Sequence, residues 1–334
     1  AVHAPHHAPR EWIDKFAGQF DAGWDALRAE IFQRQIELGV IPADTELTQR
    51  PEEILSWDEY PDRYKPVASR LMEAFAGFLA HTDHHIHRLL TSLEERGMLD
   101  NTLVFYITGD NGASGEGTLH GAWSAPSFQN GRPEDPEWLL EHMDDFGSAD
   151  CENHYNYPWA WALDSPFQWM KQVASHFGGT RNAMAVSWPK GITDAGGMRT
   201  QFHHVVDIAP TIYEACGITQ PNSVNGIEQM EVHGTSMAYT FDVADIEDRH
   251  ETQYFEMMGN RGVYHRGWMA SCFHGRPPWI RWQGMPFDGE QERWELYDLR
   301  TDFSQAVDVA AQHPEKLADR KSTRLNSSHR SLSR

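Results

Sequence analysis

The chain has 334 residues, of which 40% are hydrophobic and 12% aromatic, and its mean hydropathy is -0.61. This length can bury a large core in one large domain or two smaller ones, and no apolar run is long enough to span a membrane. The formal charge of -21 repels nucleic acid and anionic membrane surfaces at long range, so we expect neither as a partner. A negatively charged substrate would therefore need cations that are placed locally.

Three widely separated cysteines, Cys151, Cys216 and Cys272, predict neither a disulfide framework nor a Cys-x-x-Cys metal site. The chain begins at Ala1 without a methionine and inside a motif, so its start looks truncated. The sequence thus leaves open whether this soluble protein is periplasmic or cytoplasmic. Residues 321–334 are rich in serine and arginine and contain no acid, and we expect a non-native or disordered tail there.

The N-terminal part predicts helices. Residues 1–9 hold three histidines among alanines and prolines, and the prolines exclude a regular helix. Apolar residues at near-helical spacing predict one or two helices over residues 11–38 and a long helix over residues 67–96. His81 and His85 lie four residues apart in the long helix. Because the apolar stripe occupies the other side, a polar helix face is a better interpretation than a zinc site.

A short apolar run over residues 103–108 predicts a strand that ends in Gly-Asp-Asn-Gly at residues 109–112. A nearly all-apolar strand is expected to be covered on both faces, in a sheet between helices that binds ligands at the carboxyl ends of its strands. Asp110 and Asn111 lie at such an end, and their side-chain oxygens suit Ca2+ or Mg2+. The alternative is a turn whose side chains bond only their own backbone.

The next segments are less regular. Residues 115–166 are rich in glycine, proline, asparagine, aspartate and tryptophan, which is typical of a functional loop such as a lid or a substrate wall. Residues 167–181 predict a short helix that ends in a chain reversal at Gly178 and Gly179.

Residues 184–188 predict a second buried strand. A helix over residues 207–216 is expected to turn Ile212 and Cys216 toward the core. Strands and helices therefore alternate, which predicts an α/β layer architecture.

From about residue 251 the pattern changes to short strands joined by glycine and proline turns. The predicted strands cover residues 253–258, 262–265, 267–273 and 294–299. We expect a smaller antiparallel-sheet subdomain over residues 251–320 after a first domain over residues 1–250, with a last helix over residues 306–320.

Several motifs occur in a characteristic order. They are the strand with Gly-Asp-Asn-Gly over 102–112, the Lys171–Arg181 segment with Gly-Gly-x-Arg, His204-x-x-Asp207-x-x-Pro210-Thr211, and Trp294-Glu-Leu-Tyr-Asp-Leu299. Together they resemble a type I sulfatase, an arylsulfatase of the alkaline-phosphatase-like superfamily, over about its later two thirds. The resemblance implies a mixed sheet flanked by helices, a smaller C-terminal antiparallel sheet, and hydrolysis of small-molecule sulfate esters.

The resemblance also implies roles for individual residues. Asp110 and Asn111 match the family's second pair of Ca2+ ligands, and Lys171 matches the lysine that contacts the sulfate and the leaving-group oxygen. His3 matches the histidine on the leaving-group side. Fixed cations at these places would stabilise the charge that develops during ester cleavage, and His3 or Lys171 could protonate the leaving oxygen. Mg2+ is the less suitable ion.

The residues by themselves leave alternatives open. His6 and His7 are about as good candidates as His3, and a lysine at the start of a short helix is usually exposed to solvent. His176 could support the lysine from a nearby position, and Arg181 is expected to hold the Gly-Gly turn.

The family's nucleophile is a formylglycine made from a Cys-x-Pro/Ala-x-Arg motif, and two calcium-binding aspartates precede it. This chain contains neither, and the Cys272–Arg276 segment lacks the proline or alanine that the motif requires. We therefore expect the formylglycine and about half of the Ca2+ ligands to lie in missing upstream sequence. The chain should then be an inactive fragment that binds Ca2+ poorly.

Two other functions remain open, as does the oligomeric state. A phosphatase or phosphodiesterase of the same superfamily uses two zinc ions and commonly has Asp-His where this chain has Asp110 and Asn111. An amide oxygen is a poor zinc ligand and a good calcium ligand, which favours the sulfatase. A non-catalytic metal-binding homologue would keep the fold and lack the nucleophile.

Overall fold

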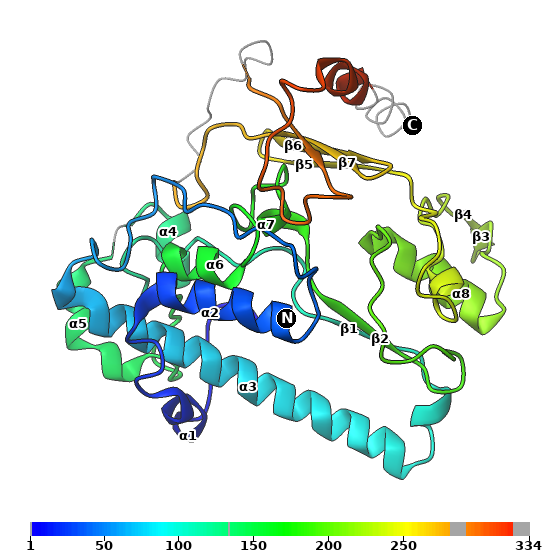
Figure 1. Ribbon diagram of the computed structural model, residues 1–334. Helices are drawn as coiled ribbons and strands as arrows, with labels where there is room; N and C mark the ends of the chain where they lie inside the picture. The colour runs from blue at the N-terminus through cyan, green and yellow to red at the C-terminus, as the bar shows by residue number, and fades with distance from the viewer. Residues whose placement is uncertain (1, 133, 281–291, 323–334) are drawn as a thin grey trace.

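The computed structural model describes residues 2–132, 134–280 and 292–322. Helices and sheets alternate along the chain, and the C-terminal part contains a four-stranded antiparallel sheet (Figure 1). The α/β class and the C-terminal sheet expected from the sequence are therefore confirmed. The domain boundary at residue 250 stays a prediction, and the predicted tail, apart from residues 321 and 322, lies outside the described residues.

The N-terminal part forms a layer of helices, which the sequence predicted over residues 11–38 and 67–96 but not over residues 115–166. Its α-helices are α1 (Arg10–Ile13), α2 (Gly23–Glu37), α3 (Lys65–Glu95), α4 (Ala125–Gln129), α5 (Pro136–Glu141) and α6 (Tyr157–Leu163). Short 3-10 helices cover Asp14–Phe16, Asp62–Tyr64, Leu99–Asn101, Met143–Asp145, Val205–Asp207 and Ala238–Thr240. Among the described helices, none combines the length and the apolar character needed to cross a lipid bilayer.

An aromatic core around Trp24 holds this layer together. The Trp24 ring is fully buried and meets Trp57, Tyr60 and Trp159 edge to face, at centroid distances of 4.7, 5.1 and 5.6 Å. Such pairs contribute about 0.5–1.5 kcal/mol each beyond their buried area. The segment over residues 115–166, predicted as a lid or substrate wall, supplies Trp159 and the buried helix α6 to this core. That prediction was wrong for α6, because its aromatic side chains outweigh the polar residues around it.

Arg28 connects α2 to the segment that follows α6. Its buried guanidinium donates to the carbonyl oxygens of Trp161 and Phe167 at 2.6 and 2.8 Å and to the Thr48 hydroxyl at 2.8 Å. Burial lowers the pKa of Arg28 to about 9, which still leaves the group charged at neutral pH. This cation therefore satisfies backbone acceptors that the core would otherwise leave without partners.

Replacing Arg28 by alanine is expected to lower the free energy of unfolding by about 3 kcal/mol or more, because several buried acceptors lose their donor. Urea unfolding followed by circular dichroism measures the change. The matched control is Arg34→Ala on the exposed side of the same helix, which should change stability by less than about 0.5 kcal/mol. Equal effects of the two substitutions would contradict the role given to Arg28.

The central strands are β1 (Val104–Ile107) and β2 (Met184–Ser187), which pair antiparallel with Val104 opposite Ser187. The prediction that both strands are buried is wrong, because Ile107 is 41% exposed and Met184 is 37% exposed. In the part of the chain that the structure describes, each strand pairs only with the other. Neither therefore has a second strand along its outer edge.

The segment between the central strands differs from its prediction. The helix expected from residue 167 is replaced by turns in which Trp169 and Gln172 have φ of 65° and 77°, values that an α-helix excludes. A single helical turn, α7 (Phe177–Thr180), contains the two glycines instead. Positive φ at two non-glycine residues gives no signal in the periodicity of the sequence.

Helix α8 (Ile208–Cys216) starts after Asp207, as predicted. Its apolar side is not in the core, because Ile212 is 41% exposed and Cys216 is also exposed. The prediction for these two side chains was therefore wrong, and Thr211 is the one buried residue of the helix. The short hairpin of β3 (Ser223–Val224) and β4 (Ile227–Glu228) follows, and Figure 1 shows α8 and this hairpin far from the helical layer.

The C-terminal sheet has the strand order β5-β6-β7-β8 and is antiparallel throughout. Its strands are β5 (Thr252–Met257), β6 (Asn260–His265), β7 (Trp268–Cys272) and β8 (Glu295–Asp298). Alternate residues form two apolar clusters on opposite faces, one around Trp268 and Leu296 and one around Met269 and Tyr297. The last predicted helix is shorter than expected and covers residues 314–322.

Candidate functional site

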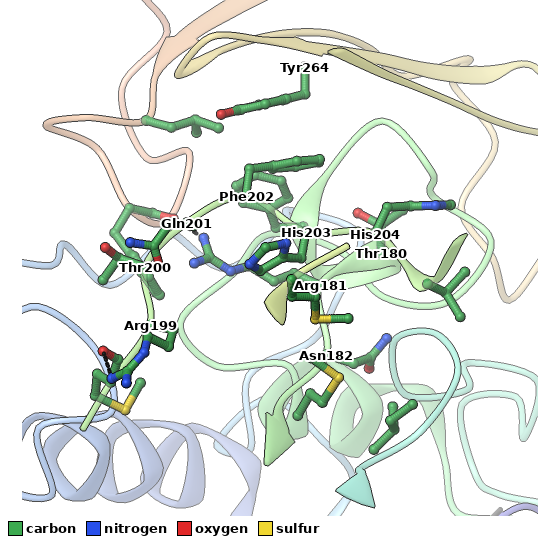
Figure 2. A pocket seen from close by; sticks show the side chains of 18 of the residues that line it. Thr180, Arg181, Asn182, Arg199, Thr200, Gln201, Phe202, His203, His204 and Tyr264 are labelled. Atoms are coloured by element: carbon green, nitrogen blue, oxygen red, sulfur yellow. Dashed lines mark hydrogen bonds between the residues drawn. The ribbon is translucent and has the colours of Figure 1, made fainter. Parts of the chain in front are cut away.

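A large cavity, with a volume of about 1930 Å³, lies at the ends of the central strands. Its walls come from the loop after β1, the Lys171–Arg181 segment, β2, the residues before α8 and one face of the C-terminal sheet. Figure 2 shows the part of the wall that carries Arg181, Asn182 and the residues from Arg199 to His204. Most of the sequence motifs that resemble a sulfatase therefore border one space.

The loop after β1 is locked against the Gly-Gly segment by backbone contacts. The Gly112 amide donates to the Gly179 carbonyl, and the Lys171 amide donates to the Ala113 carbonyl, both at 3.1 Å. A Cβ atom on Gly112 would lie 1.7 Å from the Gly178 carbonyl oxygen, so a side chain there is excluded. The glycines of both motifs thus allow the two segments to touch.

Asp110 and Asn111 lie on the cavity wall within this loop. The Asn182 amide, oriented with its nitrogen toward the Asn111 carbonyl, pairs with the Asn111 backbone at 2.9 and 3.2 Å. Within the described residues, neither the Asp110 nor the Asn111 side chain makes a hydrogen bond, so both remain available as oxygen donors. The alternative of a self-bonded turn was therefore wrong, and the donor chemistry fits a hard cation.

The described residues do not form a metal centre by themselves, however. Among the described residues, no group of three or more His, Cys, Asp or Glu side chains could hold a metal ion. Ca2+ takes about six to eight oxygen ligands, and Asp110 and Asn111 could supply only some of them.

Lys171 lines the same cavity, and His3 contacts it from the N-terminal segment. The Lys171 Nζ atom lies 3.4 Å from His3 Nε2 and 3.4 Å from Glu116 Oε2. The structure thus brings the predicted lysine and histidine together, and the lysine lines the same cavity as Asp110 and Asn111. Glu116 is an additional member that the sequence did not reveal.

The other candidate histidines have different partners. His6 is buried among aromatic rings, and burial lowers its pKa well below the ordinary value. The His7 ring contacts a backbone carbonyl oxygen at 2.6 Å. His176 pairs with Glu295 at 3.1 Å instead of supporting Lys171. Of the histidines considered from the sequence, His3 is the one that contacts the lysine.

Arg181 has the structural role expected from the sequence. Its guanidinium lies over the Phe177 and Phe303 rings at 5.1 and 4.0 Å and donates to the Phe303 carbonyl at 3.4 Å. Burial lowers its pKa to about 10, so the cation persists at neutral pH. It connects the Gly-Gly turn to the C-terminal segment.

A second polar cluster borders the cavity at the start of α8. The buried Asp207 carboxylate accepts from the backbone amides of His204 and Thr235 at 2.8 and 2.7 Å and contacts His250 Nδ1 at 2.9 Å. Burial alone would raise the pKa of Asp207, but the nearby His203 ring, 3.7 Å away, and the hydrogen bond with His250 lower it. Burial alone would lower the pKa of His250, but the Asp207 carboxylate raises it.

His250→Asn is expected to lower the free energy of unfolding more at about pH 5.5 than at about pH 9. A raised folded-state pKa stabilises the fold fully below the unfolded pKa of about 6.5, and this stabilisation is lost as the pH rises through the folded pKa. Urea unfolding at several pH values measures the difference between wild type and variant.

The matched control is His233→Asn, which removes an imidazole at an exposed position. The lowered pKa of Asp207 also matters for the acid end of the comparison. The stability that its carboxylate contributes is lost only in acid well below about pH 5.5. A pH-independent difference for His250→Asn would show that the ion pair does not form.

Comparison with known proteins identifies the class. The sulfatase family matches residues 1–218, and the family described as N-sulphoglucosamine sulphohydrolase, C-terminal, matches residues 167–330. The first match covers more than half of the chain, so the chain belongs to the sulfatase family.

Individual relatives agree with this. An uncharacterized sulfatase of Schizosaccharomyces pombe is 28% identical over 323 residues, which cover 95% of this chain and 54% of the relative. The arylsulfatase of Klebsiella aerogenes is 28% identical over 238 residues, which cover 71% of this chain and 49% of the relative. The chain thus spans about half the length of the curated relatives it matches.

Solved structures are more distant. A putative sulfatase from Bacteroides fragilis superimposes with a TM-score of 0.48 at 11% identity, covering 95% of this chain and 49% of that structure.

Proposed function

We propose that this chain is part of an arylsulfatase that hydrolyses sulfate esters of small molecules. One observation carries the proposal: Lys171 Nζ lies 3.4 Å from His3 Nε2, which is distant in the sequence, and Lys171 lines the same cavity as Asp110 and Asn111. The family and the Klebsiella arylsulfatase support the same reaction.

The chemistry of these side chains fits ester cleavage. Breaking the ester bond leaves negative charge on the departing oxygen, and the Lys171 ammonium and the His3 imidazole are 3.4 Å apart where they can share its protonation and stabilisation. Ca2+, when held by the Asp110 and Asn111 oxygens, would supply positive charge for the sulfuryl oxygens. Mg2+ fits less well, because it demands stricter octahedral geometry.

We infer that the formylglycine nucleophile and the remaining Ca2+ ligands come from additional sequence. Support comes from exposed apolar side chains on three elements: Leu89 of α3 is 62% exposed, and Ile107 of β1 and Ile212 of α8 are also exposed. Apolar surface and an unpaired strand edge are normally covered in a folded protein. The curated relatives are about twice as long as the matched region, and additional sequence of that kind could cover these surfaces.

Asn111 separates this proposal from its closest alternative. A two-zinc phosphatase needs nitrogen or carboxylate ligands, and the amide oxygen of Asn111 is a poor zinc ligand. A non-catalytic metal-binding protein would have no use for the paired Lys171 and His3, whose arrangement suits a reacting anion. The sulfatase therefore accounts for the larger part of the site.

The full-length protein is expected to hydrolyse an aryl sulfate in a Ca2+-dependent way, and Lys171→Ala should lower kcat/KM about 10²–10³-fold. Release of the phenol from an aryl sulfate, with and without a chelator, measures both effects, and an aryl phosphate tests the phosphatase alternative. Lys190→Ala, at an exposed lysine, is the control. Turnover unchanged by Lys171→Ala would remove this lysine from the site.

The chain by itself should bind Ca2+ with a dissociation constant of about 10⁻³ M or weaker, because too few ligands are present. Isothermal titration calorimetry on the 334-residue chain measures the affinity. Asp110→Asn should remove the remaining binding. Micromolar affinity in the chain alone would show that the metal site is already complete, against the inferred need for further sequence.

A further inference from the structure

Glu116 is a carboxylate that the reaction proposed above does not use. It lies in the glycine-rich segment that follows Asp110 and Asn111, and its side chain is 13% exposed. Its Oε2 atom faces Lys171 Nζ at 3.4 Å, and its Oε1 atom accepts from Gln172 Nε2 at 2.9 Å. The Ser114 hydroxyl lies 3.3 Å from Oε2. Both carboxylate oxygens thus have fixed partners.

Gln172 is itself held in a defined orientation by the C-terminal part of the chain. Its Oε1 atom accepts from Arg276 Nη2 at 2.8 Å, and its carbonyl oxygen accepts from Asn260 Nδ2 at 3.0 Å. Because a guanidinium can only donate, the amide oxygen must face Arg276 and the amide nitrogen must face Glu116. The positive φ of Gln172 is a costly backbone conformation, which surrounding contacts must hold.

The charges around Glu116 keep it ionised. Burial alone would raise its pKa, but the Lys171 ammonium, then His154, and the hydrogen bond from Gln172 lower it. A lysine side chain has four flexible carbon–carbon bonds and an ammonium without preferred direction, so a fixed anion is needed to hold it in one place. Glu116 is the carboxylate that contacts Lys171 among the described residues.

We propose that Glu116 is the positioning residue of the site: it directs the Lys171 ammonium toward the reacting anion beside His3, while Gln172 fixes Glu116 from the side of the C-terminal sheet. The catalytic meaning rests on the proposed sulfatase function. The contact itself belongs to this chain and can be tested without turnover.

The first test measures the mobility of Lys171 in the chain as it stands. The six lysines are labelled by reductive ¹³C-methylation, and Lys171→Arg assigns the Lys171 signal. In the wild type, the methyl order parameter of Lys171 should exceed that of the exposed Lys190. Glu116→Gln should lower it to the Lys190 value, and Glu116→Asp should restore part of the difference. An unchanged order parameter in Glu116→Gln overturns the proposal.

A second variant keeps the proposal testable if Glu116→Gln does not fold. Gln172→Met keeps the carboxylate and removes the amide that holds it, so Lys171 should again become more mobile. Glu256→Gln is the charge control, since Glu256 lines the same cavity, is exposed and accepts a hydrogen bond from its own turn instead of from Lys171. Greater Lys171 mobility in the charge control than in Gln172→Met would overturn the proposed contact.

The second test uses the full-length enzyme. Glu116→Gln should lower kcat about 10–100-fold with KM changed less than about threefold, because the lysine is present but misplaced. Glu116→Asp should recover part of the rate. A purely structural role would lower stability without this division between kcat and KM. If the protein does not hydrolyse sulfate esters, the mobility measurement still decides the contact, so the failure of one proposal is distinguishable from that of the other.

Discussion

The close approach of two glycine segments is the constraint on which the site depends. The Gly112 Cα lies where any Cβ would collide with the Gly178 carbonyl oxygen, and the amide of Gly112 bonds the carbonyl of Gly179. This contact places the oxygen donors of Asp110 and Asn111 on the same wall as Lys171. Two short motifs, about sixty residues apart in the chain, therefore act as one structural unit.

Charge explains why such a unit must be fixed firmly. A chain with a formal charge of -21 opposes the entry of an anion, and the opposing field is overcome only where cations are concentrated. The Lys171 ammonium lies between Glu116 and His3. Gln172 donates to Glu116 and accepts from Arg276, which follows strand β7 of the C-terminal sheet. The C-terminal part of the chain is thus connected to Lys171, although no predicted site residue lies on its antiparallel sheet.

The sequence predicted the elements well because apolar periodicity is a local property. The long helix α3, strands β5 to β8 and the gathering of Lys171 with His3 all follow from pattern and resemblance. Glu116 could not be found in this way, because one glutamate in a glycine-rich segment looks the same whether it is solvated or paired. The turns at Trp169 and Gln172 could not be predicted for a related reason, because tertiary contacts impose their positive φ values.

The errors about burial have one physical cause. Apolar residues in β1, β2 and α8 show that these elements require cover, but a pattern does not show whether the cover lies in the same stretch of sequence. The same elements border the cavity where Asp110 and Asn111 hold uncommitted oxygens. Exposed apolar side chains and side-chain oxygens without hydrogen bonds therefore occur around the same cavity, which explains why the apolar pattern predicted buried strands that the described residues do not cover.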